Sequence, residues 1–254
     1  MEPILRVEGL TKTFSRQGQM DVSAVKGISF SLFPGEKLGI IGESGSGKTT
    51  AVNMITRLLD ATSGSIFLEG EDITTVKGAA LHKVYRKMQM VFQTPTDSFD
   101  PRRTLGDGIG ESLENAGFSK KETQKRVGIL LKECGLSADY AQRYPHQVSG
   151  GQCQRAAIAR ALAIKPKLLF CDEATSALDV TVQKEVIELL NELSAQQGKN
   201  LSILFICHDI SLVQQFCDRV LVMYHGEILE EGTPDEIIRH PKNAYTRQLI
   251  DSVL

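Results

Sequence analysis

The sequence predicts an α/β fold with a core of buried parallel strands and an inserted helical subdomain. Two patterns carry this prediction. Continuous apolar runs of strand length alternate with segments of helical periodicity, and a polar, helix-rich tract separates the earlier runs from the later ones. At 254 residues the chain has room for one large domain, or for a core with one inserted subdomain.

The first part of the chain predicts a strand, a turn, a second strand and a helix. "KGISFSLFPGEKLGIIG" alternates apolar and polar residues, turns at Pro34-Gly35 and then becomes a continuous apolar run typical of a buried parallel strand. "KTTAVNMITRLL" has apolar residues at helical spacing and predicts a helix over 48–59. "ATSGSIFLEG" predicts a turn, a short strand and another turn.

From about Ser98 to Lys165 the sequence becomes polar, with helical periodicity in "KKETQKRVGILLKECG" and "GQCQRAAIARALAI". Two further buried strands, "KLLFCDE" and "LSILFICHD", flank the helix "TVQKEVIELLNELSAQQG", which implies a parallel, right-handed crossover. The last part predicts a hairpin around His225-Gly226 and a short helix opened by Thr233-Pro234. We interpret the acidic pair between them, Glu230 and Glu231, as a solvated turn.

Composition excludes several classes of protein. The formal charge of −2 gives no basic excess to attract nucleic acid. No apolar run is long enough to cross a bilayer, and the first ten residues resemble no export signal. The cysteines form no CxxC pair and lie in apolar segments, so we expect small buried side chains in a reducing compartment: Cys134, Cys153, Cys171, Cys207 and Cys217. The histidines outside "CHD" lack metal-ligand spacing.

The stretch "GESGSGKT", residues 42–49, fits the pattern G-x-x-x-x-G-K-[ST] between a predicted strand and a predicted helix. In that context backbone N–H groups and the positive helix terminus converge on one point, which favours phosphate. Lys48 can reach the β- and γ-phosphates and Thr49 can offer its hydroxyl to Mg²⁺. The alternative, a flexible glycine-serine loop, leaves the lysine unexplained.

A pair of carboxylates ends the strand "LLFCDE". The carboxyl ends of parallel strands are where α/β sheets bind ligands. We therefore expect Asp172 in the Mg²⁺ shell and Glu173 beside a water that it orients or deprotonates. A solvated acidic pair at a strand end is the alternative.

A second anion-binding helix terminus is predicted at "VSGGQ", where Ser149, Gly150 and Gly151 precede a strong helical pattern. One ATP needs only one such phosphate-binding helix terminus, and the chain contains two. The economical explanation is that two chains pair head to tail, each giving this segment to the nucleotide of the other.

These motifs, in this order over nearly the whole chain, resemble those of the ATP-binding cassette (ABC) ATPases. "GESGSGKT" resembles Walker A, "VFQ" at Gln93 the Q-loop, "VSGGQ" the signature, "LLFCDE" Walker B, "SALD" at 176–179 the D-loop and "CHD" at His208 the switch histidine. "TKTF" places Phe14 where the family stacks an aromatic ring on adenine, more usually a tyrosine.

The resemblance implies a P-loop NTPase fold with a mostly parallel core sheet, an antiparallel β subdomain and an inserted α-helical subdomain. The core with its β subdomain would take up residues 1–97 and 166–254, and the helical subdomain, which carries the signature, residues 98–165. The activity implied is ATP hydrolysis coupled to transport, with ATP and Mg²⁺ as cofactors.

The resemblance also implies site roles. Glu173 would be the general base, Gln93 would contact Mg²⁺ or the attacking water, and His208 would hold the γ-phosphate and that water. The Mg²⁺ ligands would be Thr49, Gln93 and Asp172. The nucleotide contacts would be Phe14, Gly42, Glu43, Ser44, Gly45, Ser46, Gly47, Lys48, Thr49, Thr50, Gln93, Ser149, Gly150, Gly151, Gln152 and Asp179, with the signature residues acting on the partner's nucleotide and Asp179 linking the two sites.

Within the family, "QMVFQTPTDSFDPRRTLGD" and "HPKNAYTRQLIDSVL" resemble the ATPases of oligopeptide, dipeptide and nickel importers. That likeness implies a peripheral protein on the cytoplasmic face of the membrane. Its partners would be two permeases, a second ATPase chain and, indirectly, an extracytoplasmic binding protein. Peptide and chelated metal both remain open as cargo, as do homodimer and heterodimer. A regulatory or repair ATPase is the alternative function, and a small-molecule kinase would leave "VSGGQ" and "SALD" unexplained.

The segment 94–110 would meet the permease, because it connects Gln93 to the helical subdomain. Phe99 and Leu105 either contribute to that contact or pack inside the subdomain.

Overall fold

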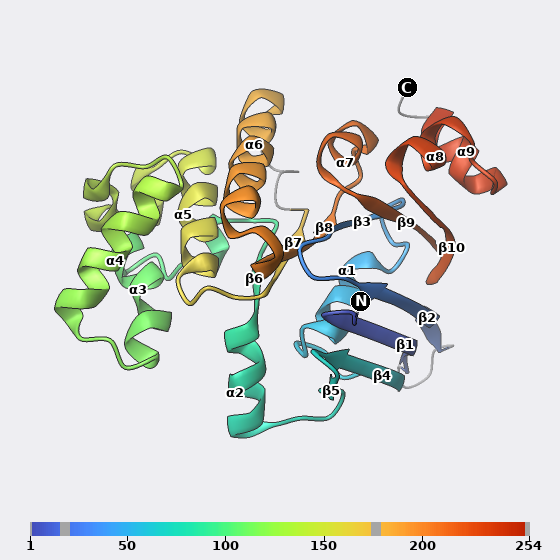
Figure 1. The fold of residues 1–254 in the computed structure, drawn as a ribbon, viewed down its shortest axis with the longest axis horizontal. Helices are drawn as coiled ribbons and strands as arrows, with labels where there is room; N and C mark the ends of the chain where they lie inside the picture. Colours follow the sequence, from blue (N-terminus) through green and yellow to red (C-terminus); the bar gives the residue numbers. More distant parts are fainter. Residues whose placement is uncertain (1, 16–20, 174–178, 252–254) are drawn as a thin grey trace. The chain divides into compact units, whose positions relative to one another are not determined.

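The computed structural model describes residues 2–15, 21–173 and 179–251 (Figure 1). The chain forms two compact units. The first combines Met1–Tyr85 with Lys199–Leu254, and the second is Arg86–Gly198.

An antiparallel sheet of four strands in the order β2-β1-β4-β5 forms one part of the first unit. Its strands are β1 (Leu5–Phe14), β2 (Val22–Leu32), β4 (Ser63–Leu68) and β5 (Glu71–Asp72). Leu5 pairs with Leu32 on one side and Leu68 on the other, and all three side chains are buried. This sheet is the antiparallel β subdomain that the family resemblance implies.

The second sheet of this unit carries the phosphate-loop strand. β3 (Lys37–Ile41) runs parallel to both β8 (Ser202–Ile206) and β9 (Arg219–Tyr224). β10 (Glu227–Gly232) pairs with β9 in an antiparallel hairpin, as predicted around His225-Gly226. All five side chains of β8 are buried, which is why its sequence is continuously apolar after Ser202.

The helices of the first unit are α1 (Lys48–Ile55), α7 (Ile210–Phe216), α8 (Pro234–Arg239) and α9 (Ala244–Asp251); α2 (Gly78–Lys87) ends just beyond the unit boundary. The predicted helix over 48–59 is too long. Arg57 takes a positive φ of 61°, which no helix continues through, and the Leu58 side chain is 54% exposed. The apolar period at Leu58 therefore does not mark a buried helix face.

The second unit contains β6 (Met88–Val91), parallel to β7 (Leu168–Asp172), and four longer helices. These are α3 (Leu105–Asn115), α4 (Lys120–Glu133), α5 (Gly150–Leu162) and α6 (Val180–Gln197), with short 3-10 turns at η1 (Thr96–Ser98), η2 (Ala138–Gln142) and η3 (Pro145–Gln147). A last turn, η4 (Gly198–Asn200), crosses the unit boundary.

Helices α3, α4 and α5 pack against one another (Figure 1). The predicted helical character of 98–165 is confirmed, whereas its subdomain boundaries, and the crossover from β7 to β8, stay predictions.

Phe99 and Leu105 lie inside the second unit. Phe99 is 5% exposed and Leu105 is fully buried. The Phe99 ring lies under the guanidinium of Arg160, 4.6 Å from centroid to Cζ, and against Gly108, where a Cβ would come within 2.6 Å of it. Of the two alternatives, packing within the unit is the one that the structure supports.

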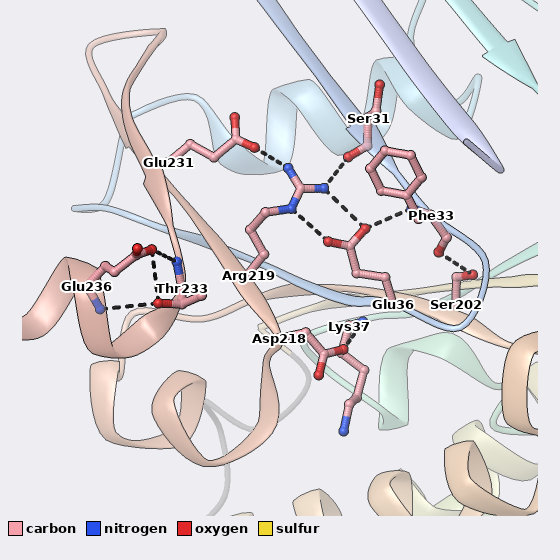
Figure 2. Close-up of polar contacts among 10 residues, drawn as sticks. All are labelled: Ser31, Phe33, Glu36, Lys37, Ser202, Asp218, Arg219, Glu231, Thr233 and Glu236. Carbon is pink, nitrogen blue, oxygen red and sulfur yellow. Dashed lines mark hydrogen bonds and ion pairs between the residues drawn. The ribbon is translucent and has the colours of Figure 1, made fainter. Parts of the chain in front are cut away.

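A polar network at the start of β3 and β9 joins both sheets of the first unit (Figure 2). Arg219 donates from Nε to Glu36 across 2.7 Å, and also contacts Glu231 and the carbonyl oxygen of Ser31. Glu36 in turn accepts from the backbone N–H of Phe33 across 2.7 Å. Glu231 is therefore an ion-pair partner, not part of a solvated turn, and this network fixes the strand that leads into the phosphate loop.

Candidate active site

The phosphate loop connects the buried strand β3 to α1, as the sequence predicts. Gly42 and Gly47 have φ angles of 150° and 102°. A Cβ would lie 2.1 Å from the carbonyl oxygen of Met223 at Gly42, and 2.4 Å from that of Ala24 at Gly47. Both positions therefore require glycine, because the backbone passes so close to its neighbours.

The ammonium of Lys48 lies inside this loop. Its Nζ donates to the carbonyl oxygens of Gly42 and Glu43 across 2.7 and 2.8 Å, and lies 3.4 Å from Ser46 Oγ. The residue is only 4% exposed. A buried positive charge held by loop carbonyls, at the N-terminus of α1, makes this loop electrostatically suited to a phosphate.

Two further contacts hold the loop. The carbonyl oxygen of Ser46 accepts from the N–H of Gly226 in the β9–β10 hairpin across 2.9 Å. The N–H of Glu43 donates to the hydroxyl of Tyr245, in α9, across 3.0 Å. Tyr245 could not be predicted as a site residue, because nothing local in "HPKNAYTRQLI" indicates a contact with the loop.

The remaining predicted residues of the first unit lie at element ends. Thr49 and Thr50 are in the first turn of α1, and the Thr49 side chain is exposed. Phe14 ends β1, with 41% of its surface exposed and the Nζ of Lys12 5.2 Å from its ring centroid. His208 follows β8 and is exposed. An exposed aromatic ring is suited to stacking on a base, because it still has an open face.

The second unit brings two predicted catalytic residues into contact. Gln93, just after β6, donates from Nε2 to Oε2 of Glu173, just after β7, across 2.9 Å. The parallel pairing of β6 with β7 places both residues at carboxyl ends of neighbouring strands. Glu173 has a positive φ of 45°, an uncommon conformation for a residue with a side chain and one that concentrates at functional sites.

The predicted Mg²⁺ ligands are an aspartate, a hydroxyl and an amide. Asp172 ends β7 and is 6% exposed. Among residues 2–15, 21–173 and 179–251, no three His, Cys, Asp or Glu side chains form a metal-binding group. Mg²⁺ commonly keeps water and phosphate ligands and needs only one or two protein carboxylates, so a donor set with Asp172 as its carboxylate fits this ion.

The signature segment forms the N-terminus of α5. Ser149 is the N-cap: its Oγ accepts from the N–H of Gln152 across 3.3 Å, and Gln152 Oε1 accepts from the N–H of Ser149 across 3.0 Å. Gly150 opens the helix, and a Cβ on Gly151 would lie 2.5 Å from Val182 Cγ1 of α6. This capping box sets the helix terminus whose N–H groups would face an anion.

Asp179 is the N-cap of α6, where its Oδ1 accepts from the N–H of Val182 across 3.0 Å. The other residues of "SALD", 176–178, lie outside the described part of the chain.

All five cysteines are buried thiols outside any disulfide. Burial raises the pKa of Cys134 to about 12, of Cys153 to about 11 and of Cys171 to about 12. The prediction of small buried side chains is confirmed. No helix of the described residues is both long and apolar enough to span a bilayer.

Comparisons with known proteins agree with this geometry. The profile of the ABC transporter family matches residues 25–176. The chain is 42% identical to the oligopeptide transport ATP-binding protein OppF of Streptococcus mutans, over 98% of this chain and 81% of that protein. It is 43% identical to the glutathione import ATP-binding protein GsiA of Pectobacterium atrosepticum, over 99% of this chain; it spans only 41% of the length of GsiA.

Two solved structures are also similar. One is the dimeric post-hydrolysis state of the cassette MJ0796 bound to ADP and Pi, with a TM-score of 0.82, 31% identity, and coverage of 91% of this chain and 98% of that one. The other is cbiO1 of Clostridium perfringens, part of the transporter complex cbiONQ, with a TM-score of 0.83, 30% identity, and coverage of 94% and 92%.

Proposed function

Because this chain belongs to the ABC transporter family, we propose that it is an ATP-hydrolysing subunit of a membrane importer, in which ATP binding joins two cassettes and hydrolysis releases them. The observation that carries the proposal is the loop from Gly42 to Gly47 with the ammonium of Lys48 buried inside it. Loops of this form bind nucleotide triphosphates.

Hydrolysis adds water across the terminal phosphoanhydride bond. The water oxygen bonds to the γ-phosphorus, the bond from phosphorus to the bridging oxygen breaks, and ADP and inorganic phosphate leave. In the proposed scheme Glu173 accepts the proton of the attacking water, and Gln93, bonded to Glu173, fixes the direction of that carboxylate. His208 would position the γ-phosphate, and Lys48 would balance its charge.

Bound Mg²⁺ would neutralise charge on the β- and γ-phosphates, held by Thr49, Gln93 and Asp172. Phe14 would stack on the base. The contacts to phosphate would come from residues 42–50.

The two-chain arrangement is part of the proposal. Ser149 and Gly151 would bind the γ-phosphate held by the partner, and Asp179 would link the two sites. MJ0796 was solved as a dimer, which supports pairing of this kind for the cassette. A dimer formed by this chain alone would identify the partner as a second copy, and a dimer formed only with a companion subunit would identify it as a related chain.

The proposed cargo is a peptide, since two relatives are named for oligopeptide transport and glutathione import and glutathione is itself a short peptide. A chelated metal such as nickel is the second cargo that the sequence leaves open. The proposed partners are two permeases and an extracytoplasmic binding protein, with this chain on the cytoplasmic face of the membrane.

The test has two parts. The purified chain should release phosphate from Mg²⁺-ATP, and Glu173→Gln should lower that rate by about a hundredfold or more while ATP still binds. The Glu173→Gln variant with ATP should form a dimer, alone or with its companion subunit, and adding Ser149→Ala to it should weaken that dimer. Purification of the chain from membranes should also recover a permease. The proposal would be overturned if the native chain, with any companion, bound ATP without hydrolysing it, or if no permease were recovered with the chain.

A further inference from the structure

The C-terminal segment from Pro241 to Asp251 packs against other parts of the first unit, to which it belongs. Tyr245, Leu249 and Ile250 of α9 are each less than 10% exposed. At the start of the segment, the carboxylate of Glu230 accepts from the N–H of Lys242 across 2.9 Å and of Asn243 across 3.1 Å. Glu230 is itself only 8% exposed, so the expected solvated turn is wrong here as well.

Tyr245 is held from two directions within this segment. Its ring lies against that of Tyr224, at the end of β9, with 4.0 Å between centroids. Its N–H donates to Oδ1 of Asn243 across 2.9 Å. These contacts restrain both the ring and the backbone of Tyr245, so its hydroxyl is held in place beside the phosphate loop.

Both backbone polar groups of Glu43, its N–H and its carbonyl oxygen, are hydrogen-bonded. Its N–H donates to the Tyr245 hydroxyl across 3.0 Å, and its carbonyl oxygen accepts from Nζ of Lys48 across 2.8 Å. The same carbonyl oxygen accepts from the N–H of Ser46 across 3.2 Å. The Tyr245 hydroxyl thus accepts from the peptide unit between Gly42 and Glu43, and the carbonyl oxygen of that same unit, on Gly42, accepts from Nζ of Lys48 across 2.7 Å.

We propose that Tyr245 is a positioning residue for the phosphate loop, and that the segment 241–251 is in this way a structural part of the nucleotide site. By accepting from the N–H of Glu43, the hydroxyl holds the loop in the conformation that places Lys48 beside a phosphate. Nucleotide binding then does not have to order the loop. The inference rests on the proposed function for its nucleotide, but the hydrogen bond itself does not depend on it.

Tyr245→Phe removes the hydroxyl and keeps the ring. We expect the dissociation constants for ATP and for ADP to rise about threefold to tenfold, which is the range of one net hydrogen bond. KM for ATP should rise by the same factor, with kcat changed less than about twofold, because the hydroxyl orders the loop before the chemistry begins. Tyr224→Phe is the matched control, since it removes a hydroxyl from the ring stacked on Tyr245, and it should change neither constant.

Amide hydrogen exchange followed by NMR tests the bond without nucleotide. In Tyr245→Phe the Glu43 amide should exchange about threefold to tenfold faster, while the amides of α9 keep their native rates. Unchanged Glu43 exchange, or an increase spread over α9 with none at Glu43, would overturn the inference. If the native chain binds no ATP, the proposed function is wrong. The exchange rate of the Glu43 amide in Tyr245→Phe then still shows whether Tyr245 holds the loop.

Discussion

Gln93 donates a hydrogen bond from Nε2 to Oε2 of Glu173 across 2.9 Å, between residues eighty positions apart in sequence. The contact arises because β6 and β7 are paired in parallel, with Gln93 two residues beyond the end of β6 and Glu173 directly after β7. It gives Gln93 a role that does not depend on any ligand: it orients the proposed general base. Gln93→Ala should therefore lower kcat by about tenfold to a hundredfold, since a misdirected base loses that much, with a smaller effect on KM.

Gln214→Ala is the control for this prediction. Gln214 also donates from Nε2 to a carboxylate, that of Asp235, across 3.2 Å at an exposed site. Steady-state phosphate release should be unchanged in Gln214→Ala. If both variants keep native kcat, the contact between Gln93 and Glu173 has no part in hydrolysis.

Ser149 combines a structural role, which the structure shows, with a proposed one in binding. As the N-cap of α5 it stabilises the helix, and Ser149→Ala should cost about 0.5–2 kcal/mol in free energy of unfolding. Ser119 caps α4 with the same arrangement, its Oγ accepting from the N–H of Glu122 across 3.4 Å. Urea unfolding of Ser149→Ala and Ser119→Ala should show losses of similar size.

The two serine variants should differ in activity. Only Ser149→Ala should also lower ATP hydrolysis and ATP-dependent pairing of the chains, because only Ser149 is proposed to meet the partner's nucleotide. Equal activities in the two variants would leave Ser149 with its capping role alone.

The phosphate loop could be predicted from sequence because its determinants are local. Twelve consecutive residues contain the buried strand, Gly42 and Gly47, and Lys48 at the start of the helix. Each of these directly restricts the backbone conformation of its neighbours. The same holds for the capping box at Ser149 and Gln152, which spans one turn.

The contacts that support the loop could not be predicted in this way. Tyr245 meets Glu43 across 202 positions of sequence. Glu230 and Glu231 have the composition of an exposed turn, and only the packing of the C-terminal segment and Arg219 gives them partners. The predicted end of α1 was wrong for a different reason. The apolar periodicity continues to Leu58, but the positive φ at Arg57 ends the helix before that residue.

Arg219 should be a major contributor to the stability of the first unit. Its side chain and that of Glu36 are 20% and 13% exposed, and the pair is bonded in two places. Arg219→Met would leave the Glu36 carboxylate without its cation, and we expect a loss of about 2–4 kcal/mol in free energy of unfolding. Chemical denaturation of the purified variant measures this loss.

Arg239→Met is the matched control. Arg239 lies 3.8 Å from Asp235, and both side chains are about 70% exposed. Such pairs contribute at most about 1 kcal/mol. Equal losses in the two variants would show that burial does not strengthen the Arg219 network.

The buried thiols should resist alkylation. Because burial raises the pKa of Cys134 and Cys171 to about 12 and of Cys153 to about 11, almost no thiolate is present at neutral pH. N-ethylmaleimide should modify these three residues far more slowly in the native chain than in guanidinium, as mass spectrometry of digests can measure. Rapid native labelling of any of them would show that its thiol is accessible and more acidic than its burial implies.

The attachment of the C-terminal segment should depend on pH through Glu230. Burial alone would raise the pKa of this carboxyl, but the N–H donors of Lys242 and Asn243, the nearby Thr246 hydroxyl and the charge of Lys242 together outweigh it, and the net shift is downward from the usual 4.5. A pKa that is lower in the folded than in the unfolded state means that folding favours the ionised form. Its contribution is therefore complete above pH 4.5 and is lost as the pH falls through the lower, folded value.

Glu230→Gln removes this charge at every pH. The variant should be less stable than the native chain by about 1.5–3 kcal/mol near pH 7, the usual range for hydrogen bonds to a charged group. The difference should shrink as the pH falls below 4.5, because the native carboxyl is then progressively protonated. Urea unfolding of both chains between about pH 3.5 and pH 7 measures it, and Glu192→Gln, at an exposed position on α6, should show no difference at any pH. A native-minus-variant difference that stays constant over that range would mean that the Glu230 charge does not hold the segment on which Tyr245 reaches the phosphate loop.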